Sequence, residues 1–101
     1  PLALPSSSEG VDHAWRNYVL EHDDRDLIRQ YLSDSGVQTN LSYAPPMHLQ
    51  PVYHFMKKGE NRYPVAERSC SRLFGLPIGP HIDDNQAEHV VQTLHNFFGS
   101  R

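Results

Sequence analysis

The residues best suited to chemistry lie in one proline-rich stretch, residues 42–53, which reads SYAPPMHLQPVY. It carries four side chains that can hydrogen-bond a ligand: Tyr43, His48, Gln50 and Tyr53. Stiff loops that follow a strand often display binding groups, and tyrosine rings there could stack on a base or a sugar. The stretch therefore predicts a binding loop, although a packed surface loop explains the same residues equally well.

The seven histidines call for a test of metal binding, but their spacing does not favour a site. His89 and His95 are six positions apart, which separates them by about 240° around a helix. His48 and His54 have the same separation. Cys70 falls on the expected inner face of a helix and is interpreted as a structural thiol. We predict no metal site and no catalytic residue in this chain.

Two other patterns have structural explanations. The pairs Asp23–Asp24 and Asp83–Asp84 resemble catalytic carboxylates, but each pair comes at an expected helix start, where aspartate caps free N–H groups. The six glycines are scattered and form no phosphate-binding motif. Neither pattern therefore predicts catalysis.

The composition limits the function classes. The chain has 101 residues, 38% of them hydrophobic, which suits one domain. A net charge of -3 argues against a nucleic-acid partner, and no apolar run reaches the roughly 20 residues that span a membrane. The single cysteine fits a reducing compartment, so we expect a cytoplasmic protein. Because the sequence starts at Pro1, we expect it to be a piece of a longer protein.

Hydrophobic periodicity predicts the elements that position the loop. A lead-in is expected over 1–10 and a long connection over 44–63, with a short turn of helix over 52–56. Strands are expected over 11–20, 37–43 and 73–77. Helices are expected from Asp23–Asp24 to a stop at Gly36, over 64–72, and from Ile82 to Gly99, where Asp83 and Gln86 resemble a capping box.

Together these elements predict an α+β fold of two layers. It has a small sheet of about three strands packed with about three helices. Strands separated by helices could be parallel, and the spacing alone does not decide their direction. The last helix has the clearest apolar face, made of Ala87, Val90, Val91, Leu94, Phe97 and Phe98.

The segment GVQTNLSYAPPMHLQPVYHF, Gly36 to Phe55, resembles a motif of the DegT/StrS-type nucleotide-sugar aminotransferases, G-I-x-T-x-x-H-Y-P-x-P-L-H-L-Q-P-x-Y. The resemblance extends in the same order over nearly the whole chain. Arg25-Asp26-Leu27 resembles the RD-x-L helix start of that family, residues 63–68 resemble its FPVAE motif, and residues 76–78 resemble LP-(M/I).

The resemblance implies the small C-terminal domain of a pyridoxal-phosphate enzyme of type I aminotransferase fold. The lysine that forms the Schiff base belongs to the missing large domain in such enzymes, and Lys57 and Lys58 match no Schiff-base motif. The resemblance also implies a homodimer. We therefore expect the full-length enzyme to use pyridoxal phosphate, and this chain alone to bind none and to be inactive.

The activity implied is transfer of an amino group, with glutamate as the expected donor, to a nucleotide-linked keto-sugar. In that reading Tyr43 and His48 line the sugar-nucleotide cleft as substrate-binding residues, whereas Gln50 and Tyr53 are structural.

Three departures from the family pattern put substrate choice in doubt. Ser42 stands for a usual histidine, Ala44 for a usual proline, and Arg16 for a frequent histidine. A relative that dehydrates the sugar is one alternative. A free-standing, non-enzymatic binding or interaction domain is another, and the length of the natural protein separates it from the enzyme reading.

Overall fold

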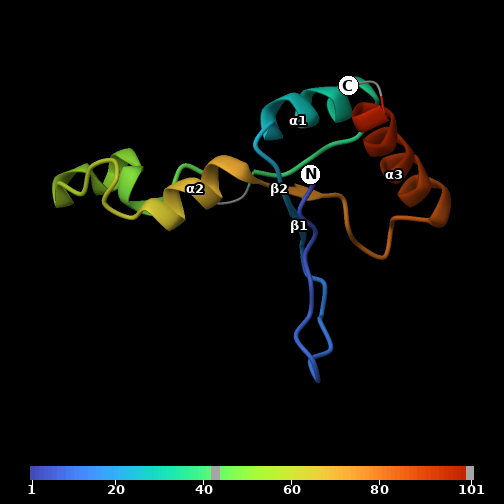
Figure 1. Ribbon diagram of the computed structural model, residues 1–101, viewed down its shortest axis with the longest axis horizontal. Coiled ribbons are helices and arrows are strands. Elements are labelled where there is room, and N and C mark those ends of the chain that lie inside the picture. Colours follow the sequence, from blue (N-terminus) through green and yellow to red (C-terminus); the bar gives the residue numbers. More distant parts are fainter. Residues whose placement is uncertain (42–43, 100–101) are drawn as a thin grey trace.

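The computed structural model describes residues 1–41 and 44–99, which form a small body with two projections (Figure 1). Its elements, in chain order, are β1 (Tyr18–Glu21), α1 (Arg25–Asp34), the 3-10 helices η1 (Met47–Leu49) and η2 (Pro51–Met56), α2 (Pro64–Arg72), β2 (Leu73–Leu76) and α3 (Asp84–Gly99). The predicted α+β class is confirmed. The strand count is corrected, because the described residues contain two strands rather than about three.

The two strands are antiparallel, with Tyr18 opposite Leu76 and Glu21 opposite Leu73. The expected strand over 11–20 therefore starts late. Residues 11–17 are exposed, and Trp15 has a φ of 52°, which interrupts extended backbone. Ala3 adds a single bridge to Glu21 on the outer side of β1.

The strand expected over 37–43 is also corrected as far as the described residues reach. Between Val37 and Leu41 only Asn40 pairs with the sheet, through two backbone hydrogen bonds to Gly75 of 2.8 and 3.0 Å. The amide of Val37 instead donates to the carbonyl of Leu32 at 2.8 Å, because this residue closes the turn after α1. Alternating apolar residues here fill the core without forming a ladder. The last two positions, Ser42 and Tyr43, lie outside the described residues.

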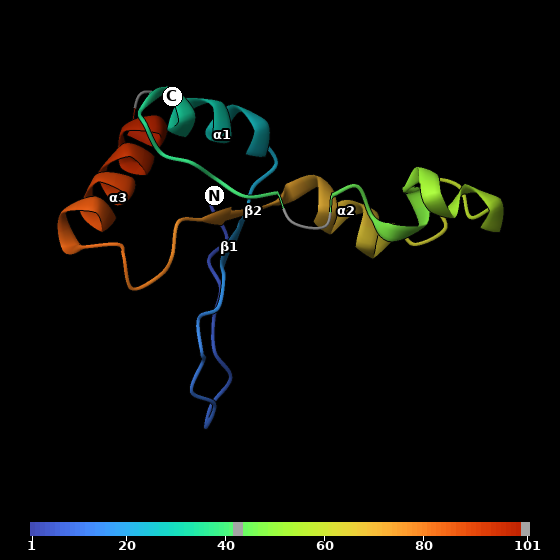
Figure 2. The same ribbon diagram turned by 180° about the vertical axis from the view of Figure 1, so that it is seen from behind.

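One apolar core holds the body together. Among the described residues, six apolar side chains are buried: Leu20, Ile28, Leu32, Val37, Phe74 and Phe97. Ile28 and Leu32 lie four apart on one face of α1, which packs against β2 and against α3 (Figure 2). From α3, Val90, Leu94 and Phe98 extend the core, as its periodicity predicts, whereas Ala87 and Val91 of the predicted face are exposed.

Most helix ends lie where the sequence predicts them. Asp83 and Gln86 form the predicted capping box, in which each side chain accepts a hydrogen bond from the other residue's amide at 2.8 and 3.0 Å. Gly36 has a φ of 81°, the left-handed conformation that ends a helix. Asp24 occupies the N-cap position of α1 but makes no side-chain cap, so only part of the expected capping there is confirmed.

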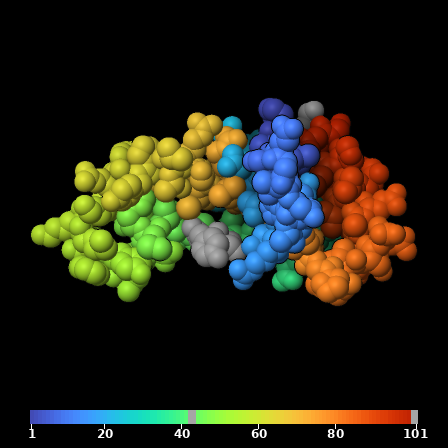
Figure 3. Space-filling view, turned by 90° about the horizontal axis from the view of Figure 1, so that it is seen from below, coloured from blue at the N-terminus to red at the C-terminus, as the bar shows by residue number. Residues whose placement is uncertain are grey.

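Two segments project from the body. One is the loop that precedes β1, and the other is the arm, which we define as residues 44–72 and which contains η1, η2 and α2 (Figures 1 and 3). The predicted turn of helix over 52–56 is confirmed as part of η2, and the predicted helix 64–72 is confirmed as α2. No helix within the described ranges is long and apolar enough to cross a membrane.

Candidate functional site

The arm contains the predicted binding loop and fixes its backbone by local contacts. The side-chain amide of Gln50 donates a hydrogen bond of 3.0 Å to the carbonyl of Pro45. Pro46 is buried, and Pro51 begins η2 with its ring already at the φ that a helix needs. These contacts restrict the backbone of residues 45–51, the described part of the loop that carries His48.

Glu67 of α2 joins three segments of the arm. Its Oε1 accepts a hydrogen bond of 2.7 Å from the backbone amide of Asn61, and its Oε2 accepts one of 3.0 Å from that of Tyr63. Oε2 also lies 3.3 Å from Nε2 of His48 on η1. One carboxylate thus connects η1, the connection that follows η2 and the start of α2.

The charge of Glu67 is stabilised by these contacts. The hydrogen bond from the Asn61 amide is the main reason that the pKa of Glu67 lies below its ordinary value of 4.5; partial burial opposes it, and Tyr63 and His48 add to it. A lowered pKa means that this contribution to stability is complete above pH 4.5 and is lost as the pH falls through the lower, folded-state value. At neutral pH the carboxylate is ionised and can only accept hydrogen bonds.

His48, one of the two predicted substrate-binding residues, is largely enclosed, and within the described residues its buried Nε2 makes no hydrogen bond. Its side chain is 9% exposed, and the edge of its ring meets the ring of Tyr63, with the two centroids 4.9 Å apart. It also lines an open pocket of about 390 Å³ together with Leu49, Gln50, His54, Lys57, Lys58, Gly59 and Glu60. The other predicted residue, Tyr43, lies outside the described part of the chain.

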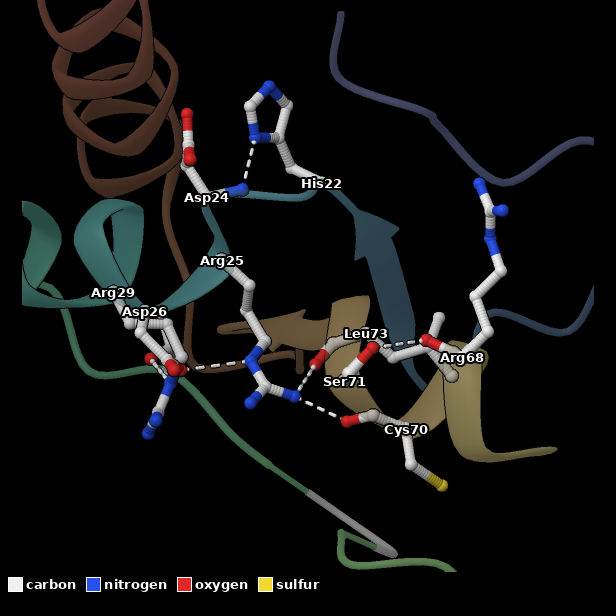
Figure 4. A network of polar contacts seen from close by, with 10 residues as sticks. His22, Asp24, Arg25, Asp26, Arg29, Arg68, Cys70, Ser71 and Leu73 are labelled. Carbon is white, nitrogen blue, oxygen red and sulfur yellow. Dashed lines mark hydrogen bonds and ion pairs between the residues drawn. The ribbon is translucent and has the colours of Figure 1, made fainter. Parts of the chain in front are cut away.

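Arginine side chains anchor the arm to the body. Arg25, at the start of α1, donates through one guanidinium nitrogen to the carbonyls of Cys70 and Leu73, where α2 ends and β2 begins (Figure 4). Its Nε also donates to Asp26 at 3.0 Å. Arg72 forms an ion pair with Asp23. Arg25 thus supplies a donor to carbonyls at the end of α2, and together with the Arg72–Asp23 ion pair it fixes the direction of the arm.

Replacing Arg25 by methionine tests this anchor. The side chain of Arg25 is only 12% exposed, so the substitution keeps its packing but removes a charged donor from two carbonyls. We expect the free energy of unfolding to fall by about 2 kcal/mol in urea denaturation. Arg68→Met is the control, because Arg68 is exposed and its guanidinium points away from the network (Figure 4). Equal losses in both variants would contradict the anchoring role.

The histidines and the cysteine have structural surroundings in the part of the chain described. No group of three histidine, cysteine, aspartate or glutamate side chains in these residues could hold a metal ion. His89 instead lies 2.9 Å from the carbonyl of Ser35, and a ring nitrogen of His22 accepts from the amide of Asp24 at 2.9 Å. Cys70 lies on α2 and is half-buried. All residues of α2 are described, and none of them is fully buried. The prediction that Cys70 lies on an inner helix face is therefore corrected: α2 faces no closed core within the described residues.

Comparison with known proteins identifies the fold. The family model of the DegT/DnrJ/EryC1/StrS aminotransferases matches residues 1–95. The chain belongs to this family. A solved family relative, DesV of S. venezuelae in complex with a ketimine intermediate, superposes with a TM-score of 0.90 and 30% identity over 95% of this chain and 26% of that one. The resemblance inferred from the loop motif is thus confirmed.

Curated relatives give the same result. The erythromycin biosynthesis sensory transduction protein EryC1 of Saccharopolyspora erythraea is 39% identical over 92% of this chain and 25% of its own length. The dTDP-3-amino-3,4,6-trideoxy-alpha-D-glucose transaminase of Streptomyces venezuelae is 31% identical over 92% of this chain and 24% of its own length. The chain thus spans about a quarter of these aminotransferase-family relatives.

Proposed function

We propose that this chain is the C-terminal domain of an enzyme that transfers an amino group from glutamate to a nucleotide-linked keto-sugar. The observation that carries the proposal is the superposition on DesV over nearly the whole chain, at 30% identity. The family model and a relative named as a dTDP-sugar transaminase support the same class of reaction and substrate. A cytoplasmic, homodimeric enzyme is part of the proposal.

The aminotransferase family implies pyridoxal phosphate in the full-length enzyme. The residues of this chain do not fit that cofactor. Its two lysines, Lys57 and Lys58, follow η2 at the outer part of the arm and line a pocket open to solvent, whereas the cofactor needs an enclosed site. We infer that the lysine and the phosphate contacts are supplied by the large domain, and we assign no catalytic residue here.

The contribution of this domain is to bind and orient the substrate. Tyr43 and His48 would line the cleft for the nucleotide sugar, and the prolines and Gln50 restrict the backbone that carries His48. Support for a covering partner comes from large apolar side chains left exposed on the arm: Met47, Val52, Phe55, Met56, Tyr63 and Val65. We propose that the large domain and a second copy of the enzyme cover them.

The experiment that tests this proposal compares the full-length protein with the isolated chain. The full-length protein, given glutamate and a dTDP- or UDP-linked keto-sugar, should form the amino sugar, identified by its mass; a dehydrated product would instead indicate the dehydratase alternative. The isolated chain, titrated with pyridoxal phosphate and reduced with borohydride, should give no stoichiometric adduct on peptide mapping. An adduct at Lys57 or Lys58 would contradict the assignment of the cofactor lysine to the large domain.

A further inference from the structure

One pocket of the arm holds both lysines of the chain. It has a volume of about 390 Å³ and lies between residues 48–50 on one side and residues 57–60 on the other. Lys57 and Lys58 are the only lysines in the sequence, which carries a net charge of -3. Among the residues described, the only acid that lines the pocket is Glu60. The lining is therefore positively charged in an otherwise acidic chain.

The fold does not use the charge of either lysine. Within residues 1–41 and 44–99, no ion pair or side-chain hydrogen bond involves the ammonium group of Lys57 or Lys58. Lys57 is exposed and Lys58 is half-buried. Arg25 and Arg72, by contrast, bind a backbone carbonyl and a carboxylate where the arm joins the body. Both ammonium groups are therefore available to a ligand.

The backbone that carries the lysines is fixed at both ends. Lys57 has a φ of 54° and Asn61 a φ of 66°, a left-handed conformation that residues other than glycine rarely adopt. The amide of Lys57 donates to the carbonyl of His54 at 3.1 Å, and the amide of Asn61 donates to Glu67 at 2.7 Å. These bonds connect residues 57–61 to η2 and to α2, and so hold the lysines at the pocket.

We propose that Lys57 and Lys58 bind the diphosphate of the nucleotide sugar, in the pocket that His48 also lines. Ammonium groups bind phosphate oxygens through charge-assisted hydrogen bonds, and the diphosphate carries the negative charge of such a substrate. Glu67, the carboxylate next to His48, does not line the pocket and already accepts two backbone amides. The inference rests on the proposed function and assigns residues to the charged part of its substrate.

Replacing the lysines in the full-length enzyme tests the proposal. Lys57→Gln and Lys58→Gln should each raise KM for the nucleotide sugar about 3- to 20-fold, and kcat at saturating substrate should change much less. Lys58→Arg keeps the charge and should change KM by less than about twofold. Arg62→Gln is the matched control, because Arg62 is exposed on the same arm but does not line the pocket. A rise in KM as large in the Arg62 variant would contradict a specific role of the lysines.

Gly59 allows a charge of the opposite sign to be placed in the pocket. A Cβ at Gly59 would meet no atom within 4 Å, so a small side chain fits there. Aspartate and asparagine have nearly the same size and differ in charge. Gly59→Asp should raise KM about 5- to 30-fold, whereas Gly59→Asn should change it by less than about threefold. Equal rises in both variants would show a steric effect and overturn the electrostatic role. If a lysine variant does not fold, this pair carries the test.

Inorganic pyrophosphate separates recognition of the diphosphate from recognition of the rest of the substrate. It should inhibit the full-length wild type competitively against the nucleotide sugar, and the inhibition constant should rise at least about tenfold when both lysines are replaced by glutamine. An active wild type that pyrophosphate does not inhibit, or inhibits as well as it inhibits the double variant, would overturn this inference alone. A wild type that aminates no nucleotide sugar would overturn the proposed function, and the diphosphate site with it.

Discussion

Replacing Phe74 by alanine is expected to lower the free energy of unfolding of this chain by about 3–5 kcal/mol. Phe74 lies on β2, is 1% exposed, and packs in the buried cluster with Leu20, Ile28 and Phe97. Domains of this size have a total stability of roughly 5–15 kcal/mol, so one such cavity removes a large part of it. Chemical denaturation followed by circular dichroism should show the transition shifted to much lower denaturant, or lost.

A matched control on the arm isolates the effect of burial. Val65 is 79% exposed on α2, so Val65→Ala should change the free energy of unfolding by at most about 0.5 kcal/mol. Phe74→Leu, which keeps most of the apolar volume, should fall between the two alanine variants. Similar stability of the Phe74→Ala and Val65→Ala variants would mean that the six buried residues are not the main source of stability.

The helices were predictable because their signals are local. Pro64 at the first position of α2 and the Asp83–Gln86 capping box both act within one turn, and the structure places helix starts at these points. The apolar spacing in α1 likewise leads to the two buried residues Ile28 and Leu32. Such features need no knowledge of the rest of the fold.

The strands were predicted less well, because pairing depends on distant residues. Residues 37–41 alternate like a strand, yet only Asn40 reaches the backbone of β2. The strand predicted over 73–77 is confirmed as β2, in which Gly75, a poor strand former, pairs with both Val19 and Asn40. Whether a residue joins the ladder was therefore decided by the position of the opposite strand, which the periodicity of one segment does not contain.

The candidate site likewise contains one residue that the sequence predicts and one that it does not. His48 was found from the loop motif, and the structure places it beside a pocket, whereas Glu67 was not singled out as a functional residue. Its signal was a carboxylate in the first turn of α2, four residues after Tyr63, which predicts a contact to the helix start. The contact to His48 could not be predicted, since it depends on how η1 folds against α2, 19 residues along the chain.

Tyr43→Phe and His48→Ala in the full-length enzyme are expected to raise KM for the nucleotide sugar about five- to hundredfold. Each removes one hydrogen-bonding group from the proposed cleft. Such a bond contributes about 1 kcal/mol, or up to about 3 kcal/mol if it reaches a charged diphosphate. Because the backbone around His48 is stiffened by prolines and by the Gln50–Pro45 contact, binding should cost little entropy there, and the His48 side chain should contribute close to the full value.

The two half-reactions distinguish substrate binding from loop structure. Glutamate is much smaller than a nucleotide sugar, so the rate of the amino-donor half-reaction, measured by stopped-flow absorbance, should change far less than that of the sugar half-reaction. Equal damage to both would indicate that Tyr43 and His48 only shape the loop. No change in either would place both side chains outside the cleft. A selective loss in the sugar half-reaction is expected only if the arm reaches the substrate.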